Sequence, residues 1–308
     1  MHVDNFLGNI FVSCDRGCNF RLSIERIYMQ DFVHLHVHTQ YSLLDGQASV
    51  SRLVDKAMKD GMKGIAVTDH GNMFGIKEFT NYVNKKNSGP KGEIKDLKKR
   101  IAGIESGEIE CEDKEAEIAD CRAKMAEAES KLFKPIVGCE MYVARRTMDK
   151  KEGKSDQSGY HLIVLAKNEK GYHNLIKLVS HAWTRGYYMR PRTDRSELEK
   201  YHEGLIVCSA CIGGEVPKKI INDQLEEAEE AVRWYKNLFG DDYYLELQRH
   251  KATVPRANHE AYPLQQKANA KLLELARKYD IKVICSNDVH FVDEENAEAQ
   301  DRKSTRLN

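Results

Sequence analysis

From residue 32 onward, the chain alternates between short apolar runs and longer stretches in which apolar residues recur every three or four positions. The second spacing is typical of a helix with one buried face. In the stretch 49–60, for example, the apolar positions are Val50, Leu53, Val54, Ala57 and Met58. The pattern predicts strands at 33–38, 64–68, 136–143, 161–166, 205–209, 243–247 and 282–287, and helices at 49–60, 73–86, 168–182, 223–238 and 260–279.

This order of elements predicts an α/β fold. Strands that alternate with helices favour a parallel sheet, because each helix returns the chain to the edge where the next strand starts. Seven strands in one unit of roughly 260 residues favour a closed or nearly closed βα barrel. An open, doubly wound sheet is the alternative.

One segment, 91–131, interrupts the rhythm. It is rich in Lys, Glu and Ala, and apolar residues recur at helical spacing on both sides of a break at Ser106-Gly107. We interpret residues 88–133 as an inserted hairpin of two antiparallel helices between the second and third strands. A solvated insertion without chemistry is the simpler interpretation, and an arm that docks a partner is the alternative.

Composition narrows the functional classes. Among the 308 residues, Lys+Arg and Asp+Glu both number 48, so the formal charge is zero and any binding of nucleic acid requires a local patch. No apolar stretch approaches a membrane span, no secretory signal opens the chain, and the eight cysteines follow no disulfide rhythm. These features indicate a reduced, cytoplasmic protein. We interpret residues 1–28 as a non-native or disordered extension before Met29, and residues 302–308 as a foreign or truncated tail.

The most informative run is His34-Leu35-His36-Val37-His38. On a regular strand the three histidines would share one face, because side chains alternate with period two. Histidines two positions apart would then lie about 6.6 Å apart at Cα, close enough for two imidazoles to share a metal ion.

Further metal-ligand types lie at the ends of the other predicted strands. In a βα barrel the carboxyl ends of the strands meet at one mouth, so ligands far apart in the sequence can converge there. Each residue alone is weak evidence, since a lone histidine is usually structural and Thr-Asp-His-Gly could simply cap a helix. A carboxylate within an apolar strand is harder to dismiss, because its burial is costly. The candidates are His36, His38, Asp45, Asp69, His70, Glu140, His161, Cys211, Asp288 and His290.

Several motifs match a known family. The segments Phe32 to Gly46, Gly64 to Gly71, Lys134 to Tyr142 and Ser286 to Phe291 resemble the PHP (polymerase and histidinol phosphatase) domain. More narrowly, Tyr-Ser-Leu-Leu-Asp-Gly and Arg-Gly-Tyr-Tyr resemble the family of bacterial DNA polymerase III α subunits. The resemblance covers about 30–301, apart from the insertion, so the expected PHP domain is 29–301.

The resemblance implies a distorted (β/α)₇ barrel whose mouth holds up to three divalent ions, Zn²⁺ or Mn²⁺. It implies that His36, His38, Glu140 and Asp288 hold the first ion and carry catalysis. Glu140, His161 and Cys211 would hold a second ion, and Asp45, His70 and His290 a third. Asp69 is expected behind the ligands, and His34 is expected to pack beside them.

The implied activity is that of a metal-dependent phosphoesterase or 3′–5′ exonuclease within a DNA-directed DNA polymerase whose catalytic palm is absent from this chain. The implied partners are the primer 3′ end, a sliding clamp and a proofreading subunit. Tyr187, Tyr188, Arg190 and Arg192 are candidate DNA contacts, since aromatics mixed with arginines suit single strands. Two alternatives stay open: a metal-bound scaffold without catalysis, and a free-standing PHP phosphoesterase. The long Gram-positive and error-prone polymerase branches fit less well.

Overall fold

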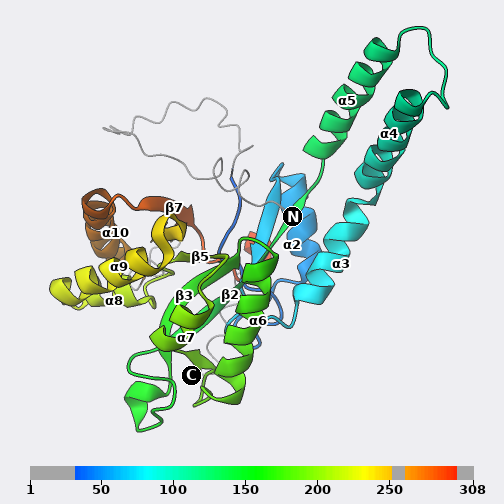
Figure 1. Cartoon of the computed structure of the whole chain (residues 1–308). Helices are drawn as coiled ribbons and strands as arrows, with labels where there is room; N and C mark the ends of the chain where they lie inside the picture. The colour runs from blue at the N-terminus through cyan, green and yellow to red at the C-terminus, as the bar shows by residue number, and fades with distance from the viewer. Residues whose placement is uncertain (1–31, 252–260, 297–308) are drawn as a thin grey trace.

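The computed structural model describes residues 32–251 and 261–296. The sequence-based interpretations of 1–28 and 302–308 therefore concern segments outside the described residues. Within the described part, one or more helices separate most successive strands, β2 and β3 excepted (Figure 1).

The sheet has the strand order β1-β2-β3-β5-β6-β7, with the short β4 paired to β2. Because β strands here are covered by helices on one side and face each other on the other, their residues are buried on both faces, as in β1 and β5. The bounds are β1 Gly64–Val67, β2 Lys134–Ala144, β3 Gly159–Ala166, β4 Arg192–Thr193, β5 Leu205–Cys208, β6 Tyr243–Gln248 and β7 Lys282–Ser286.

Residues 33–38 close the sheet into a ring, although they were predicted as a regular strand and form only an isolated bridge, between Val37 and Val289. On one side, the carbonyls of His34 and Val37 accept hydrogen bonds from β1 and from Thr68 just after it. On the other side, His38 donates to the carbonyl of Val289, and the amide of Val289 donates to the carbonyl of His36. The barrel interior is therefore lined by apolar residues from every segment of the ring: Val33, Leu35, Ala66, Ile136, Ile163, Leu165, Ile206, Cys208, Ala210, Tyr244 and Ile284.

The expectation of regular alternation in this segment is wrong. Ala66 and Thr68 are two positions apart, but the residues whose carbonyls accept their hydrogen bonds, His34 and Val37, are three positions apart. The chain also bends at His36. The extra residue acts like a β-bulge, which reverses the faces beyond it. His34 therefore lies outside the barrel, beside Lys56 of α2 and Asp60 just after it, and burial lowers its pKa to about 4.

The sheet is also not wholly parallel, which corrects a second expectation. β3 runs antiparallel to both neighbours, β2 and β5, whereas the other strand pairs are parallel. The β2–β3 connection, 145–158, carries only one short 3₁₀ turn, so no crossover helix returns the chain before β3 starts. The amino end of β3 consequently lies at the same rim of the barrel as the carboxyl ends of the others.

Helices cover the outside of the ring (Figure 1). α2 and α3 pack on Val37, Ile65 and Val67 at the start of the ring, and α6, α8, α9 and α10 pack on the strands from β3 to β6. Polar side chains start several helices, as when Ser49 and Asn168 accept backbone N–H bonds at the amino ends of α2 and α6. The bounds are α2 Val50–Lys59, α3 Ile76–Lys86, α6 Glu169–Thr184, α7 Arg195–Tyr201, α8 Glu215–Ile221, α9 Leu225–Phe239 and α10 Ala261–Tyr279.

The inserted segment forms two helices, α4 (Ser88–Ser106) and α5 (Lys114–Ser130), that pack on each other and project from the barrel (Figure 1). α4 ends where Gly107 adopts a left-handed conformation with φ of 82°, which a residue without Cβ adopts at little cost. Across the described residues, no helix combines the length and apolarity that a membrane crossing requires.

Candidate metal centre

All nine expected ligands lie at one rim of the barrel. Eight come from segments that run toward this rim, as the sequence predicts. His161 lies near the amino end of β3, and it reaches the rim because β3 runs in the opposite direction. Asp288 adopts a left-handed φ of 48°, a conformation that Asp tolerates better than most residues.

The first group joins the histidine run to the far end of the chain. The Nε2 atoms of His36 and His38 lie 3.1 and 3.2 Å from Oδ1 of Asp288. Glu140 faces the same two nitrogens, with its oxygens at 3.4 Å from His36 and 3.8 Å from His38. The ligand atoms of His36, His38 and Asp288 fit within the separation that one ion can bridge.

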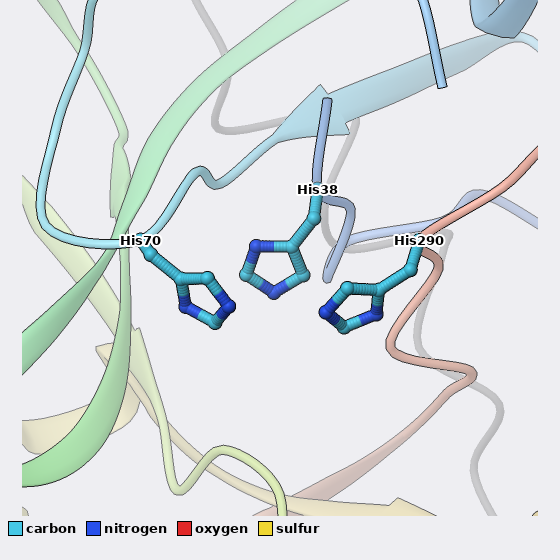
Figure 2. Close-up of side chains that lie close together, drawn as sticks. All are labelled: His38, His70 and His290. Atoms are coloured by element: carbon cyan, nitrogen blue, oxygen red, sulfur yellow. The ribbon is translucent and has the colours of Figure 1, made fainter. Parts of the chain in front are cut away.

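Two further groups flank the first. Glu140, His161 and Cys211 form one of them, with His161 Nδ1 at 2.7 Å from Glu140 and 3.6 Å from the Cys211 sulfur. In the other, the imidazoles of His38, His70 and His290 point toward one another from three separate segments (Figure 2). Asp45 adjoins this group, at 3.0 Å from Nε2 of His70 and 3.7 Å from Nε2 of His290. Glu140 also pairs with His70, so it touches all three groups.

Four buried atoms of the first group face one another at ion-pair distance and form no hydrogen bond of good geometry. They are Nε2 of His36, Nε2 of His38, Oε1 of Glu140 and Oδ1 of Asp288. Buried polar atoms are almost always satisfied, because leaving one unpaired costs about 1–3 kcal/mol. Convergent imidazole nitrogens and carboxylate oxygens are therefore what a divalent cation site requires. Imidazoles and the neighbouring Cys211 thiol suit Zn²⁺, and the carboxylates also accept Mn²⁺.

A second layer of side chains fixes how the first histidines point. Nδ1 of His36 lies 2.8 Å from Oε1 of Glu246, and Nδ1 of His38 lies 3.0 Å from Oγ of Ser42. Each contact occupies Nδ1 and leaves Nε2 to face the centre, the usual arrangement for metal-binding histidines. Ser42 in turn donates to Asp69, so Asp69 supports His38 through Ser42.

Glu246 was not among the sequence-based candidates. It alternates with apolar residues in β6 and looks like an outward-facing residue of a half-exposed strand, yet it is buried. The available signal was its position two residues after Tyr244, which places both side chains on the same face of β6. In a barrel covered by helices, a charged residue on the inner face of a strand can find polar partners only at the mouth.

Charge at the centre is shared between carboxylates and imidazoles. Burial alone would lower the pKa of His70, but the carboxylates of Glu140 and Asp45 outweigh it and raise this pKa to about 10. Burial, with His70 beside it, lowers the pKa of His38 to about 3, so this imidazole is neutral and ready to act as a ligand. Although burial acts in the opposite sense, His161 and His70 hold the pKa of Glu140 well below its usual range.

We expect Glu246→Gln to weaken binding of Zn²⁺ by about 10–100-fold, because the amide no longer supports His36 as a carboxylate does. The measurement is competition with a chromophoric chelator on chains of unchanged far-UV circular dichroism. Glu197→Gln is the matched control. Buried Glu197 also accepts from a histidine, His181 at 2.6 Å, but none of its partners among the described residues is a ligand candidate. Equal affinities for the two variants would contradict the supporting role.

The candidate DNA contacts separate into two kinds. Tyr187 and Arg190 line a pocket of about 410 Å³ at the barrel mouth, beside Asp45, His70 and His161. Tyr188 is half-buried, with its ring 5.7 Å from the Arg192 guanidinium. The expectation for Arg192 is wrong: its side chain is 0% exposed and donates to the carbonyls of Gly186, Lys150 and Met148.

Comparison with known proteins places this geometry in context. The family model described as "PHP domain" matches residues 34–250. The DNA polymerase III subunit alpha of Borreliella burgdorferi is 40% identical over 271 residues, which cover 88% of this chain and 19% of that protein. The same subunit of Aquifex aeolicus is 36% identical over 272 residues, covering 86% of this chain and 19% of that protein.

The chain thus spans about a fifth of the length of these curated relatives. A solved structure from Bifidobacterium adolescentis, provisionally described as a metal-dependent phosphoesterase, aligns with a TM-score of 0.39 and 14% identity. It covers 88% of this chain and 96% of that one, and at this TM-score the likeness carries no further conclusion.

Proposed function

The chain belongs to the PHP domain family, and from this premise we propose that it is a metal-dependent phosphoesterase that removes nucleotides from the 3′ end of a DNA strand. The observation that carries the proposal is the convergence of buried imidazole nitrogens and carboxylate oxygens of His36, His38, Glu140 and Asp288 at the barrel mouth. The similarity to DNA polymerase III α subunits supports DNA as the substrate and a replicative polymerase as the larger protein.

Divalent ions at this centre would lower the pKa of water and offset negative charge on a phosphodiester. The chain supplies the remaining parts. His36 and His38 present Nε2 because Glu246 and Ser42 occupy Nδ1. Glu140 and Asp288 contribute ionised carboxylates, since the neighbouring histidines outweigh burial and hold both pKa values well below their usual range.

In the larger protein we propose the partners that this role requires: the primer 3′ end, a sliding clamp and a separate proofreading subunit, all in the cytoplasm. A second role is supported by the origin of the ligands. They come from seven separate segments around the ring, so bound ions would also tie the barrel together. A metal-bound scaffold without turnover is therefore the second candidate.

The test is release of labelled nucleotide from a 3′-labelled single strand by the full chain with Mn²⁺ or Zn²⁺. We expect activity that the double variant His36→Ala, Asp288→Ala lacks. The control is His173→Ala with Asp241→Ala, which removes an exposed histidine and an exposed aspartate outside the centre. Undiminished activity in the first variant would rule out this centre as its source. A wild-type chain that binds metal and gains thermal stability from it, yet releases nothing, would favour the scaffold.

A further inference from the structure

The pocket at the barrel mouth has an unusual lining. One wall carries the expected ligands Asp45, His70 and His161. Along the rest lie large apolar side chains that remain exposed to solvent: Leu43, Leu44, Phe74, Trp183, Tyr187 and Met189. Exposed apolar surface gathered at one concave place, beside polar groups, is typical of a ligand site.

Three of these side chains form a row of aromatic rings. The ring of Trp183 lies 5.8 Å from that of Phe74 and 5.6 Å from that of Tyr187, centre to centre, and is within 20° of parallel to the latter. The row stays open to solvent, since Phe74 is 56%, Trp183 39% and Tyr187 49% exposed. Such rings offer flat faces at which a further planar group can stack.

The central ring is held in place. The indole Nε1 of Trp183 donates a hydrogen bond of 2.7 Å to the carbonyl of Gly71, the residue that follows His70. This bond fixes the plane of the indole and ties it to the loop that carries a metal-ligand candidate. A ring fixed before binding loses little side-chain entropy when a ligand stacks on it.

We propose that Phe74, Trp183 and Tyr187 form a stacking platform for an unpaired nucleobase at the end of a single DNA strand. The inference rests on the proposed function and names how the same site selects its substrate. A nucleobase supplies the planar face, while its phosphodiester is the anion that suits the cation-binding wall beside the rings and Arg190 in the same pocket. Bases inside a duplex are already stacked and paired, so the platform favours single-stranded or frayed ends.

The test is a binding cycle between ring and base. A 5′-fluorescein single-stranded oligothymidylate, and the same strand with an abasic 3′ terminus, are titrated with the full chain in EDTA, and fluorescence anisotropy gives Kd. We expect Trp183→Ala to raise the Kd of the intact strand about tenfold. On the abasic strand, the same substitution is expected to change the Kd little. Tyr172→Ala is the matched control, an exposed aromatic on the same helix that does not line the pocket.

The outcomes separate this inference from the proposed function. Equal Kd values for wild type and Trp183→Ala, or an equal loss on the abasic strand, would overturn the platform. Since the cycle is measured without turnover, a chain that releases no nucleotide in the nuclease assay can still show the ring–base coupling, and an active nuclease can lack it. Unchanged thermal unfolding of Trp183→Ala is required as the folding check, and Trp183→Phe, which keeps a ring without the Gly71 bond, is expected to restore most of the affinity.

Discussion

Glu140→Gln is expected to reduce metal-dependent release of nucleotides by about 10²–10³-fold, corresponding to several kcal/mol of lost electrostatic stabilisation. Glu140 touches every ligand group: Oε1 lies 2.7 Å from His161 and 3.4 Å from His36, and Oε2 faces His38 and His70. An amide of the same shape carries no charge and offers its nitrogen as a donor, so it would hold divalent cations less tightly than the carboxylate. We therefore also expect fewer bound ions per chain, measured by elemental analysis.

The matched control for this variant is Glu215→Gln. Glu215 is also a buried glutamate, but its partners are Arg195 and Lys219, outside the centre. Its replacement is expected to change stability and leave metal content and nuclease rate near wild type. If Glu140→Gln kept both its metal and its activity, the proposal that Glu140 serves all three ligand groups would be wrong.

Arg192→Leu is expected to lower the free energy of unfolding by about 3–5 kcal/mol, a fall in Tm of roughly 6–10 °C. The guanidinium is fully buried and donates bonds of 3.0, 3.1 and 2.8 Å to three backbone carbonyls. Leucine fills part of the volume but leaves all three acceptors without a partner. The carbonyls belong to two loops, 145–158 and 185–191, which the arginine holds together.

Arg190→Leu serves as the comparison, since Arg190 is two residues away and lies in the pocket wall. Its removal is expected to change stability by no more than about 0.5 kcal/mol. Denaturant unfolding followed by circular dichroism measures both. A similar small loss in the two variants would contradict the structural role of Arg192.

The sequence allowed much of the site to be predicted because strand ends in a barrel meet at one rim. His36, His38, His70 and Asp288 could thus be grouped although up to 252 positions separate them. The alternating pattern of residues 34–38 predicted the wrong face for His34, because the conformation there depends on the strands that pair with it. The bend at His36 arises because the segment pairs with β1 on one side and with Val289 on the other. The residues 34–38 contain no sequence signal for a bulge.

Burial was the second limit. Arg192 sits in a motif of tyrosines and arginines that suits a surface, and only the two loops around it reveal that its charge is satisfied by carbonyl groups. Likewise, the short β4, α7 and α8 carry too few residues to establish a period, so their pattern predicted no element. Phe74 and Trp183, from different segments, meet only in the folded chain.

The closure of the ring between residues 36–38 and 288–290 has a consequence for synthesis. A ribosome releases His36 and His38 well before Asp288 and His290, so while the barrel is being synthesised the first ligand group lacks the carboxylate of Asp288. Tight metal capture must then wait until the ring can close. Loading of the ion would mark a finished barrel, and chains stalled before residue 288 would be distinguishable by their inability to retain it.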